Sequence, residues 1–261
     1  MAVLSVDLAC RRWSDVGMVL LRRANHGTPR PGAPPAPIEC QILSSTADGL
    51  DENLIEPEVL AGRLNHLCVQ HEVRVLVLDG PQAWKSSQNG LEHARLSERI
   101  LNTVTKTGLP GMTKPYAFRT YAEFCLDVYD ALCRRGWRRL STSERALDPK
   151  QRILVESSPH AAWKSLGISP LPAKRRAHVS DLARAFAALN RMMPILTNRA
   201  PNHDQLQAII GGLSGLALEE RNNAALRIVG APPRREDGHW REGFIVLPVP
   251  PQRLRSVHWL N

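Results

Sequence analysis

The sequence predicts an α/β protein built on a mixed sheet, with elements that begin in the order β-β-β-α-β, flanking helices, and a helical insertion in the middle. Three observations lead to this fold class. Residues 2–8 and 73–79 are dominated by Val and Leu, as strands buried on both faces are. Between them lie two shorter strand-like segments and one segment with helical spacing. A length of 261 residues allows one large domain or two small ones, and we expect one domain, 1–261.

The first three strands are expected to be antiparallel. Strand 2–8 is followed, after a short polar link, by an apolar run at 16–21, and so short a link predicts a hairpin. Residues 26–37 are rich in Gly and Pro and are expected to form an irregular loop. The segment 38–43 alternates apolar and polar residues, which predicts the third strand.

A helix and a buried strand complete the first half of the sheet. Apolar residues recur at helical spacing over 56–71, with Pro57 at a tolerated early position, and the strand 73–79 follows. No G-x-G-x-x-G follows the first strand and no G-x-x-x-x-G-K-[ST] occurs anywhere. The pattern therefore differs from dinucleotide-binding and P-loop folds.

The second half is expected to be mainly helical before it returns to the sheet. The insertion spans about 90–150. The predicted elements, in order, are helices 92–107 and 119–135, strand 152–156, helices 178–192 and 203–221, and strand 243–247.

Composition narrows the class of partner and the compartment. The formal net charge of +9 is spread along the chain, which favours a phosphate-bearing partner such as nucleic acid. The five cysteines are odd in number and contain no CxxC pair, so we expect neither a disulfide framework nor a zinc knuckle. No apolar stretch reaches bilayer length, and Asp7 interrupts the first apolar run. We therefore expect a cytoplasmic protein that does not associate with membranes.

Four acidic residues stand at the ends of predicted strands or at the start of a predicted helix: Asp7, Asp79, Glu156 and Asp204. RNase H-type nucleases carry acids on strand one, at the end of strand four and on a C-terminal helix, which are the positions of Asp7, Asp79 and Asp204. Two Mg²⁺ ions about 4 Å apart can hold the attacking water and the leaving oxygen of a phosphodiester. Such hard cations take oxygen ligands. We predict an RNase H-like sheet with Mg²⁺ or Mn²⁺ on these three aspartates and Glu156 as a fourth catalytic acid.

Glycines in the helix 203–221 support this arrangement. Gly211, Gly212 and Gly215 lie among Ile and Leu, and each helical Gly costs about 1 kcal/mol relative to Ala. Close approach of the helix to the sheet would compensate that cost, and it would bring Asp204 toward Asp7.

Each acid also has an ordinary structural explanation. A strand-end Asp is often a turn residue, and Asp79-Gly80-Pro81 is a good turn sequence. Asp204 is suited to cap its helix or to sit in the first turn, where the helix dipole favours a negative charge. The joint occurrence of the four acids, rather than any one of them, favours a catalytic site.

The chain resembles a known family. The segments that carry the resemblance, in order, are VLSVDLA, VLVLDGP, ILVESSPHAAWKSLG, HDQLQAIIGGLSGLA and REGFIVLP. They are similar to the uncharacterised domain family numbered 429, whose members are predicted nucleases of RNase H-like fold. The resemblance spans most of the chain and implies a divalent-metal-dependent nuclease. It implies that Asp7, Asp79, Glu156 and Asp204 occupy the family's acidic positions, and that Arg99 lies on a polar helix after the second acid.

One departure from the family's pattern leaves a second reading open. The family commonly has another Asp three residues after the first acid of the last helix, on the same helix face, and here that residue is Gln207. Gln brings no charge and can ligate only through its carbonyl. The alternative is an eroded RNase H-like module that binds nucleic acid or nucleotide without hydrolysis. A third reading places the chain with the ATPases that share this fold, but the sequence lacks their glycine-rich phosphate loops.

A basic segment follows the first acid directly. Arg11, Arg12 and Trp13 lie just beyond Asp7, where arginines can contact phosphates and an indole can stack on an unpaired base. With Arg99, these residues are the predicted nucleic-acid contacts. The structural alternative for each basic cluster is a solvated face.

Overall fold

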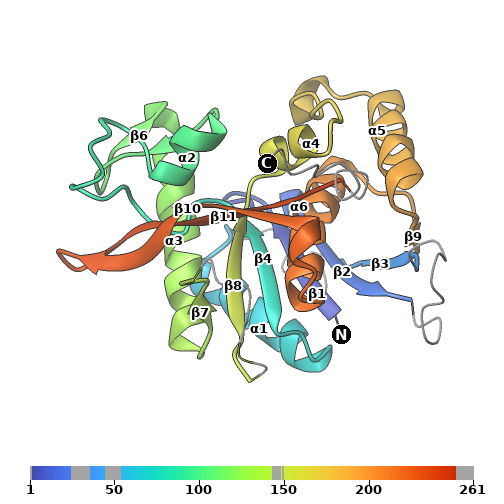
Figure 1. Ribbon diagram of the computed structural model, residues 1–261, viewed down its shortest axis with the longest axis horizontal. Coiled ribbons are helices and arrows are strands. Elements are labelled where there is room, and N and C mark those ends of the chain that lie inside the picture. The colour runs from blue at the N-terminus through green and yellow to red at the C-terminus, as the bar shows by residue number, and fades with distance from the viewer. Residues whose placement is uncertain (1, 25–35, 45–53, 143–147, 149, 251–261) are drawn as a thin grey trace, which may run out of the picture.

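A mixed sheet runs through the molecule. The computed structural model describes residues 2–24, 36–44, 54–142, 148 and 150–250. Within them the nine-stranded sheet has the order β10-β11-β8-β4-β1-β2-β3-β9, and β7 also pairs with β8 (Figure 1). Its strands are β1 (Ala2–Asp7), β2 (Gly17–Arg23), β3 (Ile38–Ile42), β4 (Val75–Asp79), β7 (Arg138–Arg139), β8 (Ile153–Ser157), β9 (Ile195–Thr197), β10 (Leu226–Glu236) and β11 (His239–Pro248).

The strand directions confirm the predicted fold class. β1, β2 and β3 pair antiparallel, whereas β1 pairs parallel with β4 and β4 pairs parallel with β8. The order β3-β2-β1-β4-β8 with these directions is the RNase H-like arrangement. The parallel register aligns the ends of β1, β4 and β8 at one edge of the sheet, so residues that end these strands become neighbours.

Helices cover both faces of the sheet. The main helices are α1 (Pro57–Gln70), α2 (Leu96–Leu101), α3 (Arg119–Arg134), α4 (Pro159–Ser165), α5 (Val179–Met192) and α6 (His203–Glu219). Buried residues of α4, α5 and α6 share one core cluster with the sheet, and buried residues of α1 and α3 share the other. Among the described residues, no helix is both long and apolar enough to cross a membrane.

Strand alternation decides which face each residue joins. In β1, Val3 belongs to the α6-side core, whereas Leu4 and Val6 belong to the α1/α3-side core. In β8, Val155 lies on the α6 side and Leu154 on the other. Because side chains alternate along a strand, every second residue toward the strand ends continues this division.

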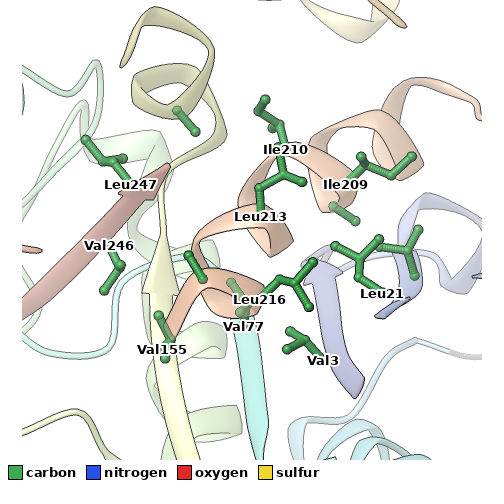
Figure 2. Packing of buried hydrophobic residues seen from close by; sticks show 14 of the residues in the cluster. Val3, Leu21, Val77, Val155, Ile209, Ile210, Leu213, Leu216, Val246 and Leu247 are labelled. Atoms are coloured by element: carbon green, nitrogen blue, oxygen red, sulfur yellow. The ribbon is translucent and has the colours of Figure 1, made fainter. Parts of the chain in front are cut away.

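The glycines of α6 allow the helix to lie directly on the sheet, as predicted. A Cβ on Gly215 would lie 2.3 Å from Val77 Cγ2 and 3.0 Å from Val3 Cγ1, and a Cβ on Gly212 would lie 2.7 Å from Ser5 Cβ. Figure 2 shows α6 seated over Val3 and Val77 with its Ile and Leu side chains filling the space on either side. The backbone cost of helical glycine is therefore offset by close packing.

The middle of the chain differs from the prediction. The prediction of a helix over 92–107 is wrong. The helix α2 is only six residues long and ends before Asn102, whose left-handed φ of 48° stops it. The β-branched run that follows leads into a short hairpin of β5 (Lys106–Thr107) and β6 (Thr113–Lys114). The predicted helix 119–135 is confirmed as α3, whose buried residues share a core cluster with those of α1.

Several elements were not predicted. These are α4, β7, β9, β10 and the short 3-10 turns, of which η1 (Trp13–Asp15) and η3 (Lys174–Arg176) matter below. β10 was hidden because Pro232 and Pro233, which lack a backbone N–H, interrupt its pattern; they lie at a register shift between Ala231 and Arg234. The predicted loop 26–37 falls almost entirely outside the described residues.

Candidate metal centre

Asp7 and Asp79 meet at the edge of the sheet. They end the parallel strands β1 and β4 and are direct register partners. Ser5 and Val77, two residues before these acids, face α6. Because side chains alternate along a strand, the side chains of Asp7 and Asp79 lie on the same face. Their carboxyl groups interact directly: in addition to burial, the charge of Asp79 raises the pKa of Asp7, so the pair favours a shared proton or a bound cation. The prediction that these two acids converge is confirmed.

Asp204 is brought to the same face by the start of α6. Asn202 caps the helix by accepting from the Gln205 N–H, so Asp204 is a first-turn acid and not the cap. The first turn rests on Gly17, the β2 partner of Asp7, where an added Cβ would lie only 2.3 Å from the Asp204 carbonyl oxygen. Asp204 is 5% exposed, and its charge acts on Asp7.

Substitution of Gly17 is therefore expected to destabilise the fold. Gly17→Ala sets a methyl group against helix backbone that has no freedom to move aside, and overpacking of this kind costs about 1–3 kcal/mol. In the matched variant Gly62→Ala the nearest atom to the new Cβ, Arg135 Nη2, is 3.7 Å away. That helical position should instead gain about 1 kcal/mol. Urea denaturation of both variants measures the contrast, and equal stabilities would contradict it.

The buried carboxyl pair has raised pKa values. Burial raises the pKa of Asp7 well above its ordinary value, and the neighbouring charge of Asp79 raises it further. Burial also raises the pKa of Asp79 to about 7, with a hydrogen bond from Asp7 opposing the change and the charge of Glu156 adding to it. The centre therefore carries more negative charge than the protein itself neutralises.

The pair is expected to make stability depend on pH. The folded pair keeps a proton that an unfolded Asp, with its pKa of 3.8, releases. The free energy of unfolding should therefore fall as pH rises from about 4 to about 7 in metal-free protein. Mn²⁺ affinity should rise over the upper part of that window, because the cation displaces the proton. Denaturation of the wild type and of Asp7→Asn at each pH isolates the contribution of the pair, as the difference between the two free energies of unfolding. If the wild type becomes more stable relative to the variant as pH rises, the assignment is contradicted.

Two side chains hold the Asp204 carboxylate. Lys174 Nζ, on η3, donates a short hydrogen bond to Asp204 Oδ2 and contacts Asp15 Oδ1 at 2.7 Å. His203 Nδ1 lies 3.3 Å from Asp204 Oδ1. Thirty residues separate Lys174 from Asp204, and the sequence carries no signal that they meet.

Glu156 takes the opposite face of the sheet. It follows Leu154 by two residues, so alternation points it toward the α1/α3 side, where Arg95 donates to both of its oxygens at 2.7 and 2.5 Å. Arg95 is 1% exposed and also pairs with Glu98 at 3.0 Å. The backbone N–H of Gln82 completes the set around Glu156. The expectation that Glu156 joins the three aspartates as a fourth acid of the centre is corrected: the aspartates share a face of the sheet, whereas Glu156 binds an arginine on the other.

Gln207 does not offer its carbonyl to the centre. Its Oε1 accepts a 2.8 Å hydrogen bond from the buried Trp163 indole N–H. The remaining amide group of Gln207 is a hydrogen-bond donor, so this position no longer resembles the second acid that it replaces.

Two adjoining cavities open beside the acids. One of about 210 Å³ is lined by Asp79, Glu156, Gln207 and His160, among others. A second, of about 450 Å³, is lined by the basic residues His93, Arg99, Lys106 and Lys114 together with Val104 and part of the 90–94 loop. Val104 lines both cavities, so a basic hollow adjoins the acidic one. Arg99 is exposed there, as a phosphate-binding residue must be.

The basic segment after β1 is only partly as predicted. Arg11 and Arg12 are exposed and remain predicted phosphate contacts. The prediction that Trp13 stacks on a base is wrong, because Trp13 is 2% exposed and belongs to the α1/α3-side core. The 3-10 turn η1 folds the indole inward under the sheet, where its apolar area is removed from water.

The donor set fits one hard divalent cation. Mg²⁺ is commonly held by one or two carboxylates with waters and substrate oxygens as the remaining ligands, which the Asp7–Asp79 pair can provide. Within the described residues, however, no group of three or more His, Cys, Asp or Glu side chains is arranged to hold a metal ion. Asp204, the expected third ligand, is engaged by Lys174 and His203.

Comparisons with known proteins give only distant structural similarity. No family model and no curated protein match the chain. A solved structure of RuvC from Thermus thermophilus is 10% identical, with a TM-score of 0.39 over 88% of this chain and 99% of that chain. T. thermophilus RuvC in complex with Holliday junction substrate gives the same identity and coverage with a TM-score of 0.38. At such identity and TM-score, neither similarity bears on what this chain does.

Proposed function

We propose that this protein is a divalent-metal-dependent nuclease that hydrolyses phosphodiester bonds of nucleic acid, and that it belongs with the domain family numbered 429. The observation that carries the proposal is that Asp7 and Asp79 are register partners at the ends of two parallel strands, beside a cavity. In the described part of the chain, no Lys, Arg or His side chain forms an ion pair with either carboxylate. Two buried carboxylates in contact are costly unless a proton or cation lies between them.

Six of the predicted residues have a role in this proposal. Asp7 and Asp79 would hold Mg²⁺ or Mn²⁺, and a bound divalent cation supplies Lewis acidity toward a phosphodiester and an activated water. Arg11, Arg12 and Arg99 would bind the phosphate backbone, and the net charge of +9 supports a polyanionic partner. Glu156 would act through Arg95, holding the wall of the cavity that Asp79 also lines.

Direct assay tests the proposal. Purified protein is incubated with labelled single- and double-stranded DNA, RNA and a Holliday junction, with Mg²⁺, with Mn²⁺, or with a chelator. We expect cleavage of at least one substrate with metal and none with chelator. Cleavage that survives chelation, or absence of cleavage on every substrate, contradicts the proposal.

A second function is favoured by the ion pairs at two of the four acids. Glu156 is held by Arg95 and Asp204 by Lys174, so half of the predicted set already has a protein cation. A module that binds nucleic acid without hydrolysing it would show affinity that persists in chelator and falls steeply with salt. Affinity of that kind, with no product on any substrate, would select this function instead.

A further inference from the structure

The Lys174 ammonium occupies a specific place in the candidate metal centre. It donates to Asp204 Oδ2, and it is held from the other side by Asp15 Oδ1 at 2.7 Å. His203 lies against the other Asp204 oxygen. The Asp204 side chain is 7% exposed, so little of this carboxylate is left for a further partner.

The same ammonium acts on Asp7. Its positive charge opposes the raised pKa of Asp7, while the charge of Asp204 adds to it, so Lys174 and Asp204 both lie within electrostatic range of the first-strand acid. In a two-cation site one ion lies between Asp7 and Asp79 and the other between Asp7 and Asp204. Lys174 occupies the Asp204 side of the second position, because its ammonium is bound to Asp204 Oδ2.

The residue that would complete a second cation site is also unavailable. Gln207 replaces the second helix acid, and its carbonyl is used by Trp163. A second divalent ion would find one carboxylate already paired and no additional oxygen from α6 at this position. By contrast, no cationic side chain among the described residues forms an ion pair with Asp7 or Asp79, and the two acids fit the one or two carboxylates that Mg²⁺ commonly takes.

We propose that this centre binds a single divalent cation, between Asp7 and Asp79, and that the Lys174 ammonium takes the place of a second cation at Asp204. This inference rests on the proposed function and narrows it to a one-metal site. Lys174 is a positioning residue: it neutralises Asp204 and, with two of its three N–H donors given to Asp204 and Asp15, leaves one for a further partner. Asp15 fixes the ammonium there, because it binds Lys174 from η1, the turn that follows β1.

Metal stoichiometry tests the inference without an activity assay. Calorimetric titration with MnCl₂ at pH 8, and anomalous scattering from Mn²⁺-soaked crystals, are expected to give one ion in the wild type, beside Asp7 and Asp79. Lys174→Met removes the ammonium, and the stoichiometry is expected to rise to two. Lys174→Arg retains the charge and should bind one ion. The Lys174 side chain is 47% exposed, so its replacement should leave the fold intact; Lys174→Gln serves if the Met variant does not fold.

A neighbour on the same turn is the matched control. Arg175→Met removes one positive charge from η3 and should leave the stoichiometry at one. Two ions in the wild type would overturn the inference and leave the proposed function standing. One ion in both Lys174→Met and Lys174→Gln would also overturn it, because the ammonium would then not be what excludes the second cation. No Mn²⁺ in any variant would overturn the proposed function as well.

Discussion

Asp7→Asn is expected to reduce metal-dependent cleavage by about three orders of magnitude while leaving the protein folded. The substitution removes one of the two carboxylates that hold the cation, and the charge stabilisation that a metal provides in such reactions amounts to several kcal/mol. A loss of about 4 kcal/mol corresponds to a rate reduction of about 10³-fold. Cleavage is measured as initial rate at saturating Mg²⁺ and pH 8.

The same variant should be at least as stable as the wild type without metal. Asp7 is a buried carboxyl whose charged form is disfavoured, so a neutral amide of the same shape relieves repulsion with Asp79. Asp127→Asn, the same change at an exposed position on α3, should alter neither activity nor stability appreciably. Undiminished cleavage by Asp7→Asn would refute the catalytic assignment. Loss of cleavage together with unfolding would show that Asp7 is needed for the fold.

Arg95→Met is expected to lower the free energy of unfolding by about 3–5 kcal/mol. The change leaves Glu98 and Glu156 buried side by side without their shared cation, and breaking a buried ion pair from one side typically costs this much. Arg95 also donates to Thr107, so that hydroxyl loses a partner too. Denaturant titration at pH 8 measures the loss.

The pH dependence of that loss identifies its cause. Burial raises the pKa of Glu156 and the charge of Arg95 lowers it, so without Arg95 this carboxyl should protonate more readily and the difference from wild type should shrink at pH 5. Arg119→Met is the matched control, since Arg119 makes an i,i+4 pair with Glu123 at 2.8 Å and its side chain is 43% exposed. Exposed helical pairs contribute about 0.3–0.5 kcal/mol. A loss in Arg95→Met no greater than in Arg119→Met would show that the buried network does not stabilise the fold.

The strands and the long helices could be predicted from sequence because their signals are local. β1 and β4 are apolar runs that have to be buried, and their last residues are aspartates, so parallel pairing makes Asp7 and Asp79 neighbours. The glycines of α6 likewise indicated its contact with the sheet. The short α2 was mispredicted because Asn102, a local stop in left-handed conformation, interrupts a region whose composition suits a helix.

What the sequence by itself determined is the β-β-β-α-β start of the sheet, the acids at the strand ends and the need of α6 for close packing. Only the tertiary structure decided which charges meet. Glu156 pairs with Leu78, one residue before Asp79, so its side chain lies on the face opposite that of Asp79, where Arg95 binds it. The turn η3 brings Lys174 onto Asp204, 30 residues later in the chain, and η1 turns Trp13 into the core. These outcomes depend on contacts between segments far apart in the chain, and neither periodicity nor composition encodes such contacts.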